Sequence, residues 1–425
     1  MQIVTPDMLD PNHPRRVVVV GSGYAGITTV VSLAHKSRPS DGLEIVLVAP
    51  LPYQEALSEL DLVAAGNPRP QWAELWHGDI FKGLDVKVIY DRLDHVVPDQ
   101  HHIVLGPTGA NTGTVPYWRL VIATGAIPSV PPIPGLREHG ITMWSVRDAH
   151  RVQESIERQF KRAATMCDAA ACREKMSVCV VGGGATGIEV IGTIADVWPR
   201  MAAKLGYPNL RPTLTVLDAR PQILYDLEQR ERDKAVRKLG ELGVDLVLGE
   251  KLASVSEDYV VTETGRTIPA AITIWCGGAK ADPDAVTWGF TTDNSGRLTV
   301  DDHHRIPSHP DIYAVGDVAA FRDPRDNHVI PMLAQFAIQG GDHVGKCIVA
   351  EARGAKDVGP FVPHMHGEYV SIGPRWGVGW MLGIPVSGWF AIVMKRMTYI
   401  IWWFISGSFR IAWRRTIQMT RMHRY

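Results

Sequence analysis

The sequence lacks the features of a secreted, disulfide-stabilised or strongly basic protein. Residues 1–16 are polar and contain no apolar core of a signal peptide, so a cytoplasmic start is expected. Only five cysteines occur among 425 residues, which argues for reduced thiols and against a disulfide framework. The formal net charge is −1, without the basic surplus typical of nucleic-acid binding, so we expect no nucleic-acid partner.

Acidic residues are missing from the last part of the chain. Residues 369–425 contain no Asp or Glu but eight Lys or Arg, so this segment carries +8. The rest holds 36 Lys and Arg against 45 Asp and Glu, a balance of −9. Residues 362–425 also hold six of the 13 tryptophans, so the sequence predicts a separate C-terminal region there.

What is present is a glycine-rich turn in a βαβ context. Residues 16–20 read as a buried strand, a helix runs to about residue 34, and residues 43–48 form the next strand. The turn between strand and helix has the pattern G-x-G-x-x-G, with Gly21, Gly23 and Gly26 around Tyr24 and Ala25. Glycines at this spacing allow a tight turn, a close pyrophosphate and close packing of helix on strand. The turn predicts a dinucleotide site.

The acidic residue that usually follows the second strand of such a unit is missing. The position is taken by Ala49, so an adenosine ribose would lack its customary carboxylate acceptor. We expect weaker binding there unless backbone groups replace the carboxylate. Loss of the acid also gives some weight to a nucleotide-sensing protein with vestigial redox activity.

The pattern returns 161 residues later. A strand over residues 177–181 leads into a second turn with Gly182, Gly184 and Gly187, a helix over residues 188–197, and a strand over residues 214–217. This strand ends at Asp218, which can accept hydrogen bonds from ribose hydroxyls and repel a 2′-phosphate. NADH is therefore favoured over NADPH, although Arg220 softens that repulsion. The long spacing predicts an insertion over residues 199–212.

The two turns lie in separate predicted domains. A polar, turn-rich segment over residues 99–114, a strand over residues 120–122 and a proline-rich linker over residues 128–134 separate them. The predicted fold is α/β, with two Rossmann-like dinucleotide-binding domains, the second inserted in the first, and a C-terminal membrane-associating helical region. The predicted boundaries are 14–134 and 298–361 for the first domain, 135–297 for the second, and 362–425 for the C-terminal region.

Four further motifs resemble one family. They are Ala123-Thr124-Gly125, the Gly-x-x-Gly-Ile-Glu run that ends at Glu189, Ile312-Tyr313-Ala314-Val315-Gly316-Asp317, and Ala334-Gln335-Phe336-Ala337-Ile338-Gln339. Together they resemble the two-domain FAD/NAD flavoproteins and, within them, the type II NADH:quinone oxidoreductases. The resemblance spans about residues 15–415, and it implies that the first domain is the FAD domain and that the NAD domain, which binds NADH, is inserted in it.

The resemblance implies FAD and NADH as cofactors, with FAD bound by the first turn, residues 123–125, Gly316, Asp317 and Ala334. It places Gln335 and Gln339 beside the flavin and quinone pocket, although two glutamines at i, i+4 also fit a solvated helix face. A helix beginning near Pro331 is expected to direct its N-terminal dipole at the flavin.

The resemblance also makes Glu189 a residue that orients the nicotinamide or gates its contact with the flavin. Stabilisation of the helix dipole is the simpler explanation for an acid in a first turn, and the two are compatible.

Two groups of reactive side chains are interpreted as structural. Cys167 and Cys172 have the C-x-x-x-x-C spacing of disulfide reductases, but that pair belongs soon after the first turn, where residues 53–65 contain no cysteine. Histidines at residues 101–102, 303–304, 364 and 366 lack a second cluster at ligand spacing, so we expect no metal.

The tail predicts a helix that lies on a membrane. Residues 376–394 are uncharged over the length of a bilayer span, but four glycines and Pro385 interrupt them. The following segment, residues 389–405, places apolar side chains along one helical stripe: Phe390, Val393, Met397, Ile401 and Phe404. Arg410, Arg414, Arg415, Arg421 and Arg424 follow. Cations and tryptophans beside an apolar stripe favour an anionic membrane interface, and a core or homodimer helix is the alternative.

The sequence therefore predicts a peripheral enzyme on the cytoplasmic face of the cell membrane. It transfers a hydride from NADH to FAD and then passes two electrons to a membrane quinone, without proton pumping. A reductase of a soluble carrier such as ferredoxin is the main alternative.

Overall fold

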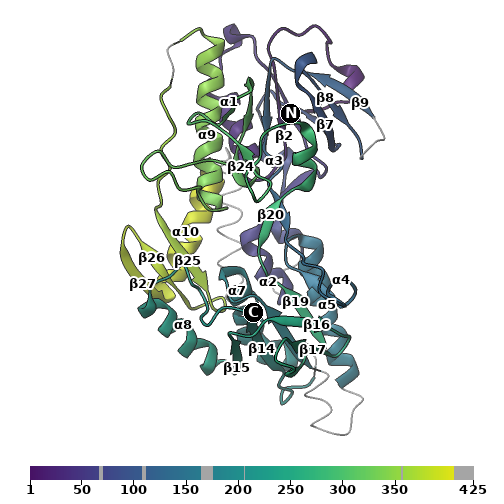
Figure 1. Ribbon diagram of the computed structural model, residues 1–425, viewed down its shortest axis with the longest axis vertical. Coiled ribbons are helices and arrows are strands. Elements are labelled where there is room, and N and C mark those ends of the chain that lie inside the picture. Colours follow the sequence, from purple (N-terminus) through teal and green to yellow (C-terminus); the bar gives the residue numbers. More distant parts are fainter. Residues whose placement is uncertain (67–69, 108–111, 164–175, 205, 356–357, 406–425) are drawn as a thin grey trace.

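The computed structural model describes residues 1–66, 70–107, 112–163, 176–204, 206–355 and 358–405. The Cys167 and Cys172 pair and the cations from Arg410 onward lie outside these ranges. Within them, two sheets form separate lobes (Figure 1), and the predicted α/β fold with two dinucleotide-binding lobes is confirmed.

The first lobe is built on a seven-stranded sheet. Its strand order is β1 (Gln2–Ile3), β6 (Lys87–Ile89), β3 (Glu44–Val48), β2 (Arg16–Val20), β10 (Arg119–Ile122), β23 (His309–Ala314) and β22 (Arg305–Ile306). All neighbours are parallel except β22 and β23. Every residue of the central strand β2 is buried, as a parallel strand covered on both faces requires. Helices α1 (Tyr24–Lys36) and α9 (Ala334–Ala352) run side by side in this lobe (Figure 1).

The second lobe has a parallel five-stranded sheet. Its order is β12 (Gly140–Thr142), β19 (Ile272–Trp275), β13 (Ser177–Val181), β14 (Thr213–Asp218) and β15 (Val244–Leu248). Its main helices are α5 (Val146–Ala163), α7 (Ala185–Lys204) and α8 (Gln229–Glu241). The predicted end of the helix near residue 197 is wrong, because α7 continues through Pro199 to Lys204, into the segment predicted as an insertion. Burial of Trp198 and Ala202 on either side of this proline offsets the local cost of the missing N–H.

Two strands connect the lobes. Strand β11 (Ala126–Pro128) pairs antiparallel with β20 (Ala279–Ala281), so the chain crosses once in each direction at the same place. The domain boundaries given above stay a prediction.

Three small antiparallel sheets and several short elements complete the two lobes. Residues 99–114 are not simply turns, because they contain β8 (His102–Leu105) and part of β9 (Gly113–Pro116), which form a sheet with β7 (Leu93–Val97). Ile103 and Leu105 of β8 and Val115 of β9 are buried in a hydrophobic core. The polar residues around them in the sequence do not indicate this burial. The other short elements are β4 (Tyr53–Glu55), β5 (Glu74–Trp76), β16 (Leu252–Val255), β17 (Tyr259–Thr262), β18 (Thr267–Pro269), β21 (Leu298–Thr299), β24 (Ala319–Ala320), α2 (Leu60–Ala64), α3 (His77–Ile80) and α4 (Leu136–His139).

The C-terminal region begins with a three-stranded antiparallel sheet and ends in a helix. The strands are β25 (Gly367–Ser371), β26 (Gly377–Met381) and β27 (Ile384–Gly388), and α10 follows over Trp389–Ile405, the range predicted from the apolar stripe. The uncharged run over residues 376–394 is thus mainly a hairpin. No helix in the described part of the chain combines the length and apolar character that crossing a bilayer requires.

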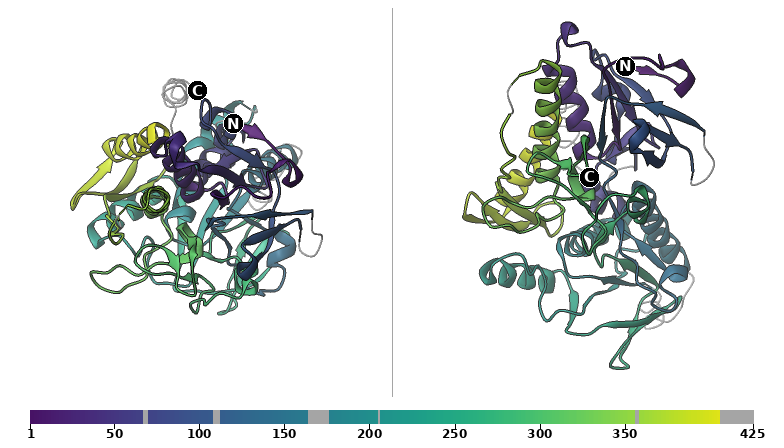
Figure 2. Two further views of the ribbon diagram at one scale, coloured as in Figure 1. Left: turned by 90° about the horizontal axis from the view of Figure 1, so that it is seen from above. Right: turned by 45° about the horizontal axis from the view of Figure 1, so that its top comes forward.

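This region lies against the flank of both lobes, as the views of Figures 1 and 2 agree. Helix α10 has two different faces. Trp402 and Trp403 point inward and belong to the main hydrophobic core, whereas Phe390, Met397 and Ile401 are about half exposed. The predicted stripe is therefore the outer face of the helix.

Candidate active site

The first glycine turn is shaped by backbone contacts that exclude any side chain. Gly21 has φ +106°, and a Cβ atom there would lie 2.2 Å from the carbonyl oxygen of Ala123. A Cβ atom on Gly26 would lie 1.9 Å from the carbonyl oxygen of Gly21. Around the Cβ position of Gly23, in contrast, no atom lies within 4 Å. The turn is thus closed toward the protein and open beyond Gly23, at the N-terminus of α1, as a pyrophosphate would need.

The third motif meets this turn. A Cβ atom on Gly316 would lie 2.9 Å from the Cβ of Ala25, and a Cβ atom on Gly341 would lie 2.5 Å from the carbonyl oxygen of Ala25. Glycines at these two positions let Gly316 and helix α9 approach α1 closely. Residues near 21, 123, 316 and 334 therefore gather at one edge of the first sheet, and this cradle fits FAD.

Helix α9 begins three residues after the predicted start. Leu333 is its N-cap in extended conformation, and its N–H donates to the carbonyl oxygen of Pro331 at 2.9 Å. Pro331 thus belongs to a turn before the helix, so the expectation of a proline in the first helical turn is wrong. Ala334 is the first helical residue, and the N-terminal dipole still lies beside Gly316 and Asp317, because Leu333 and Ala337 line the same small cavity.

Asp317 shares this cavity with a buried cation. Burial raises the pKa of Asp317, and the guanidinium of Arg297 opposes that rise. Arg297 donates to the carbonyl oxygens of Ile330, at 3.1 Å, and Ala319. Its buried Nε has no hydrogen-bond partner within the described ranges. Arg297 therefore holds the segments that flank Asp317 and the start of α9.

The second glycine turn repeats the geometry of the first. Gly182 has φ +121°, and its Cβ would lie 2.4 Å from the carbonyl oxygen of Cys276; a Cβ on Gly187 would lie 1.9 Å from the carbonyl oxygen of Gly182. The first atom near a Cβ on Gly184 is 4.0 Å away. Cys276 thus takes the place that Ala123 has in the first lobe. The signal missed in the sequence is the Gly-Gly pair that follows Cys276 after a buried strand, as Gly125 follows Ala123.

Asp218 ends β14 beside this turn, as predicted. Its carboxylate accepts hydrogen bonds from the N–H groups of Gly183 and of Arg220, the latter at 2.7 Å. The Arg220 guanidinium stacks on the ring of Tyr225, 3.5 Å from its centroid. The acid therefore fixes the turn and keeps free lone pairs toward a ribose, while the arginine lies on a neighbouring aromatic ring. These residues fit the adenosine half of NADH.

Glu189 reaches from the second lobe to the C-terminal region. It lies in the second turn of α7, so the expectation of an acid in the first turn is wrong. It accepts hydrogen bonds from the ammonium of Lys395 on α10 and from the N–H of Ser371, at 3.0 Å. The same ammonium donates to the Ser371 hydroxyl at 2.9 Å. The Lys395 and Glu189 side chains are 13% and 14% exposed, so this is a nearly buried ion pair.

Polar groups of the first lobe lie close to the Glu189–Lys395 ion pair. The Thr193 hydroxyl, one turn after Glu189, donates to Asp61 at 2.7 Å. Tyr399, one turn after Lys395, donates to the carbonyl oxygen of Ser58 at 3.0 Å, and the Ser58 hydroxyl lies 3.1 Å from that of Tyr24. Burial raises the pKa of Tyr24 to about 12, so its phenol stays protonated. A polar junction thus connects both glycine-turn helices to α10.

Gln335 and Gln339 contact the backbone of the segment before β25. The Gln335 amide donates to the carbonyl oxygen of Gly367 at 3.1 Å and accepts from the N–H of His366 at 3.0 Å. Gln339 donates to the carbonyl oxygen of His364 and accepts from its N–H, at 2.8 and 2.9 Å. These two-way hydrogen bonds exclude the simple solvated face. Both glutamines fasten residues 364–367 to α9, which sequence spacing could not reveal.

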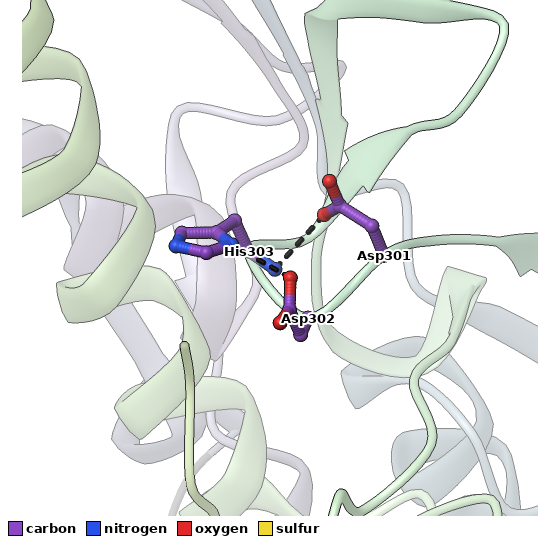
Figure 3. Close-up of side chains that lie close together, drawn as sticks. All are labelled: Asp301, Asp302 and His303. Carbon is purple, nitrogen blue, oxygen red and sulfur yellow. Dashed lines mark hydrogen bonds and ion pairs between the residues drawn. The ribbon is translucent and has the colours of Figure 1, made fainter. Parts of the chain in front are cut away.

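One possible ligand group in the described residues is Asp301, Asp302 and His303, whose ligand atoms lie within 4.8 Å of one another (Figure 3). The Asp301 carboxylate accepts from the N–H groups of His303 and Arg305, at 2.9 and 2.8 Å. Asp302 contacts the His303 ring at 2.7 Å. These bonds are those of a local turn, and the expectation of no metal stays a prediction.

The fold and these turns define a class: enzymes that hold two dinucleotides in tandem α/β lobes for oxidation and reduction. Residues 15–341 match the pyridine nucleotide-disulphide oxidoreductase family, and the chain belongs to it.

Similar proteins give a narrower comparison. A relative from Staphylococcus epidermidis described as type II NADH:quinone oxidoreductase is 26% identical over 392 residues, which cover 90% of this chain and 94% of the relative. The structure of NDH2 from Plasmodium falciparum in complex with NADH matches with a TM-score of 0.85 at 15% identity, covering 97% and 98% of the two chains. The sulfide:quinone oxidoreductase of Aquifex aeolicus gives a TM-score of 0.73 at 18% identity and covers 91% of each chain.

Proposed function

We propose that the chain oxidises NADH on bound FAD and passes two electrons to a quinone, without pumping protons. The observation that carries the proposal is the pair of open glycine turns at Gly23 and Gly184, each at a helix N-terminus and each joined to the same junction. The Staphylococcus relative, similar over 90% of this chain, supports the substrate pair. When bound, FAD supplies the ring that accepts a hydride and releases electrons to the quinone.

The first lobe binds FAD in this proposal. Gly21, Gly23 and Gly26, with Tyr24 and Ala25, present the N–H groups of a helix N-terminus to the pyrophosphate. Residues 123–125 form the wall behind it, and Gly316 leaves room for the ribityl chain. Asp317 accepts a ribityl hydrogen bond, and Ala334 brings the positive end of α9 toward the flavin.

The second lobe binds NADH. Gly182, Gly184 and Gly187 receive the pyrophosphate of NADH, and Asp218 accepts from the ribose hydroxyls. Its negative charge disfavours a 2′-phosphate. The Arg220 guanidinium, which could offset this repulsion, is stacked on the ring of Tyr225. Glu189 orients the nicotinamide from the second turn of α7, and Lys395 fixes the Glu189 carboxylate.

Gln335 and Gln339 act through the segment that they hold. Their hydrogen bonds fix residues 364–367 against α9, beside the start of the C-terminal sheet. A quinone that enters between α9 and this sheet would contact residues 364–367 in one fixed conformation. Both glutamines are therefore proposed as positioning residues of the quinone pocket.

The outer face of the C-terminal region is proposed to lie on the cytoplasmic face of the cell membrane. Helix α10 exposes Trp389, at 71%, and the stripe of Phe390, Met397, Ile401 and Phe404. The β26–β27 hairpin tip adds Leu382 and Ile384, at 71% and 64%. Aromatic and aliphatic side chains exposed together, with a cationic sequence following, suit peripheral binding to anionic lipid. A homodimer through the same face is the competing arrangement.

Anaerobic reoxidation distinguishes the proposed acceptor from a soluble one. Flavin reduced by one equivalent of NADH should be reoxidised by a soluble quinone analogue and remain reduced with oxidised ferredoxin. The reverse result would assign the enzyme to a soluble carrier. Truncation before the C-terminal region is a poor test, because it removes Lys395 and the buried Trp402 and Trp403.

A further inference from the structure

Asp61 is a buried carboxyl that the proposed reaction has not used. It lies in α2, next to the second-lobe helix α7, and is 6% exposed. Its side chain accepts a hydrogen bond from the Thr193 hydroxyl at 2.7 Å, and Thr193 is itself fully buried. A hydroxyl is a modest partner for an ionised carboxylate, because it brings no charge.

Charged groups from three elements surround this carboxyl. Helix α7 contributes Glu189, and α10 contributes Lys395 and the neutral phenol of Tyr399. Glu59, in residues 57–59, acts on Tyr399 from the third element. The Lys395 ammonium hydrogen-bonds Glu189 and Ser371, and it acts on Asp61 through space.

The junction therefore holds more negative than positive charge when Asp61 is ionised. Lys395 neutralises Glu189, with which it shares a hydrogen bond, and Asp61 is an additional carboxylate near the same ammonium. Burial raises the pKa of Asp61 to about 6; Lys395 opposes the rise and Glu189 adds to it. A proton can thus enter or leave this site near physiological pH, whereas the phenols of Tyr24 and Tyr399 have pKa values raised by burial and stay protonated.

We propose that Asp61 is a positioning residue that exchanges a proton with solvent and so sets how tightly Lys395 holds Glu189. When Asp61 is protonated, Lys395 is attracted by Glu189 alone. When Asp61 is ionised, two carboxylates compete for one ammonium, and the hold on Glu189 weakens. The step is a simple exchange: the Asp61 O–H bond breaks, the proton goes to water, and no electron moves.

This inference rests on the proposed function, because it takes Glu189 to lie beside the nicotinamide. It predicts that the rate constant for reduction of bound flavin by NADH depends on pH through Asp61. The Asp61→Asn side chain keeps the shape of the acid and can still accept from Thr193, but it is neutral at every pH. This variant should therefore show, throughout the range, the rate constant that the wild type shows near pH 5.

Two measurements on the full-length, FAD-loaded protein test the proposal. The first is the infrared difference spectrum between about pH 5 and about pH 8, recorded without NADH or quinone. Wild type and the control D196N, which removes another carboxyl of α7, should both show the C=O stretch of a buried carboxylic acid, and D61N should lack it. A band of equal size in D61N would overturn the proposal.

The second measurement is anaerobic stopped-flow reduction of the flavin by NADH over the same pH range. Wild type and D196N should show a transition that D61N loses. Thr193→Val removes the hydrogen bond to the ionised form, so its transition should move to higher pH. If D61N keeps the wild-type transition, or T193V leaves it in place, the proposal is wrong. Neither measurement involves quinone, so failure of quinone reoxidation would count against the proposed function and leave this inference standing.

Discussion

Replacing Lys395 by methionine should destabilise the protein more than any surface lysine change. Methionine keeps most of the aliphatic length but removes the ammonium that neutralises Glu189, which is only 14% exposed, and that acts on Asp61. Removing one partner of a buried ion pair typically costs about 3–5 kcal/mol, because the other charge remains buried. Glu189 keeps one donor, the N–H of Ser371, so we take the lower end, about 3 kcal/mol.

The effect is measurable as a shift in the midpoint of thermal unfolding of the FAD-loaded protein. An unfolding entropy of about 2.1 cal/mol/K per residue gives about 0.9 kcal/mol/K for this chain, so the midpoint should fall by roughly 3 °C. Lys234 provides a matched control, since it also joins the second lobe to the C-terminal sheet, through Ser387 at 3.1 Å, but outside the buried junction. Lys234→Met should shift the midpoint by less than about 1 °C.

A second substitution checks the cause of this loss. In the double variant K395M/E189Q the uncompensated carboxylate is gone, and most of the lost stability should return. If K395M shifts the midpoint no more than K234M, the ion pair does not contribute the expected stability. A double variant less stable than K395M would show that the uncompensated Glu189 carboxylate is not the cause of the loss.

Three further predictions concern the glycine turn, the outer face of α10 and the buried acid. Gly26→Ala should abolish retention of FAD, because its Cβ would lie 1.9 Å from the carbonyl oxygen of Gly21. Gly23→Ala should fold and bind FAD less tightly, since no atom lies within 4 Å of its Cβ. Equal flavin contents of the two variants after dialysis would contradict this prediction. Ile401→Glu should weaken binding to phosphatidylglycerol vesicles roughly tenfold, about 1.4 kcal/mol, while the control Val236→Glu, on the exposed side of α8, should bind as the wild type does. Asp61→Asn should be more stable than the wild type at pH 8 and equally stable near pH 4. The reason is that the stability contributed by a raised carboxyl pKa is present below about pH 4 and is lost as the pH rises through 6. For a pKa raised from 3.8 to about 6, the difference at pH 8 is up to about 3 kcal/mol. An equal offset at both pH values in thermal unfolding would exclude that explanation.

The elements that sequence predicts well are those whose pattern is local. Both glycine turns are found at their predicted places because Gly21 and Gly182 need positive φ, which few other residues tolerate. The bounds of α10 are correct because apolar side chains repeat at helical spacing along one face and Gly388 precedes the helix. Elements whose conformation depends on residues close in sequence can be predicted from the sequence alone.

The elements that sequence misses depend on distant partners. The preference for proline in a first helical turn predicts a start of α9 near Pro331, but Leu333 is the N-cap in the folded protein. Gln335 has the spacing of a solvated face, and only the folded structure shows that it hydrogen-bonds the backbone of residues 366 and 367. Asp61 and Lys395 are 334 positions apart, so no local pattern could show that they share a buried site.

The proposed enzyme holds two nucleotides so that NADH can reduce a bound flavin, and the absorbance spectrum of the protein reports this reduction. We expect the purified protein to be yellow, with about one flavin per chain. Its visible bands should bleach when one equivalent of NADH is added without oxygen, and return when a quinone analogue follows. A colourless protein that cannot be reconstituted with FAD, or a bound flavin that NADH does not bleach, would show that the protein is not an NADH-oxidising flavoenzyme.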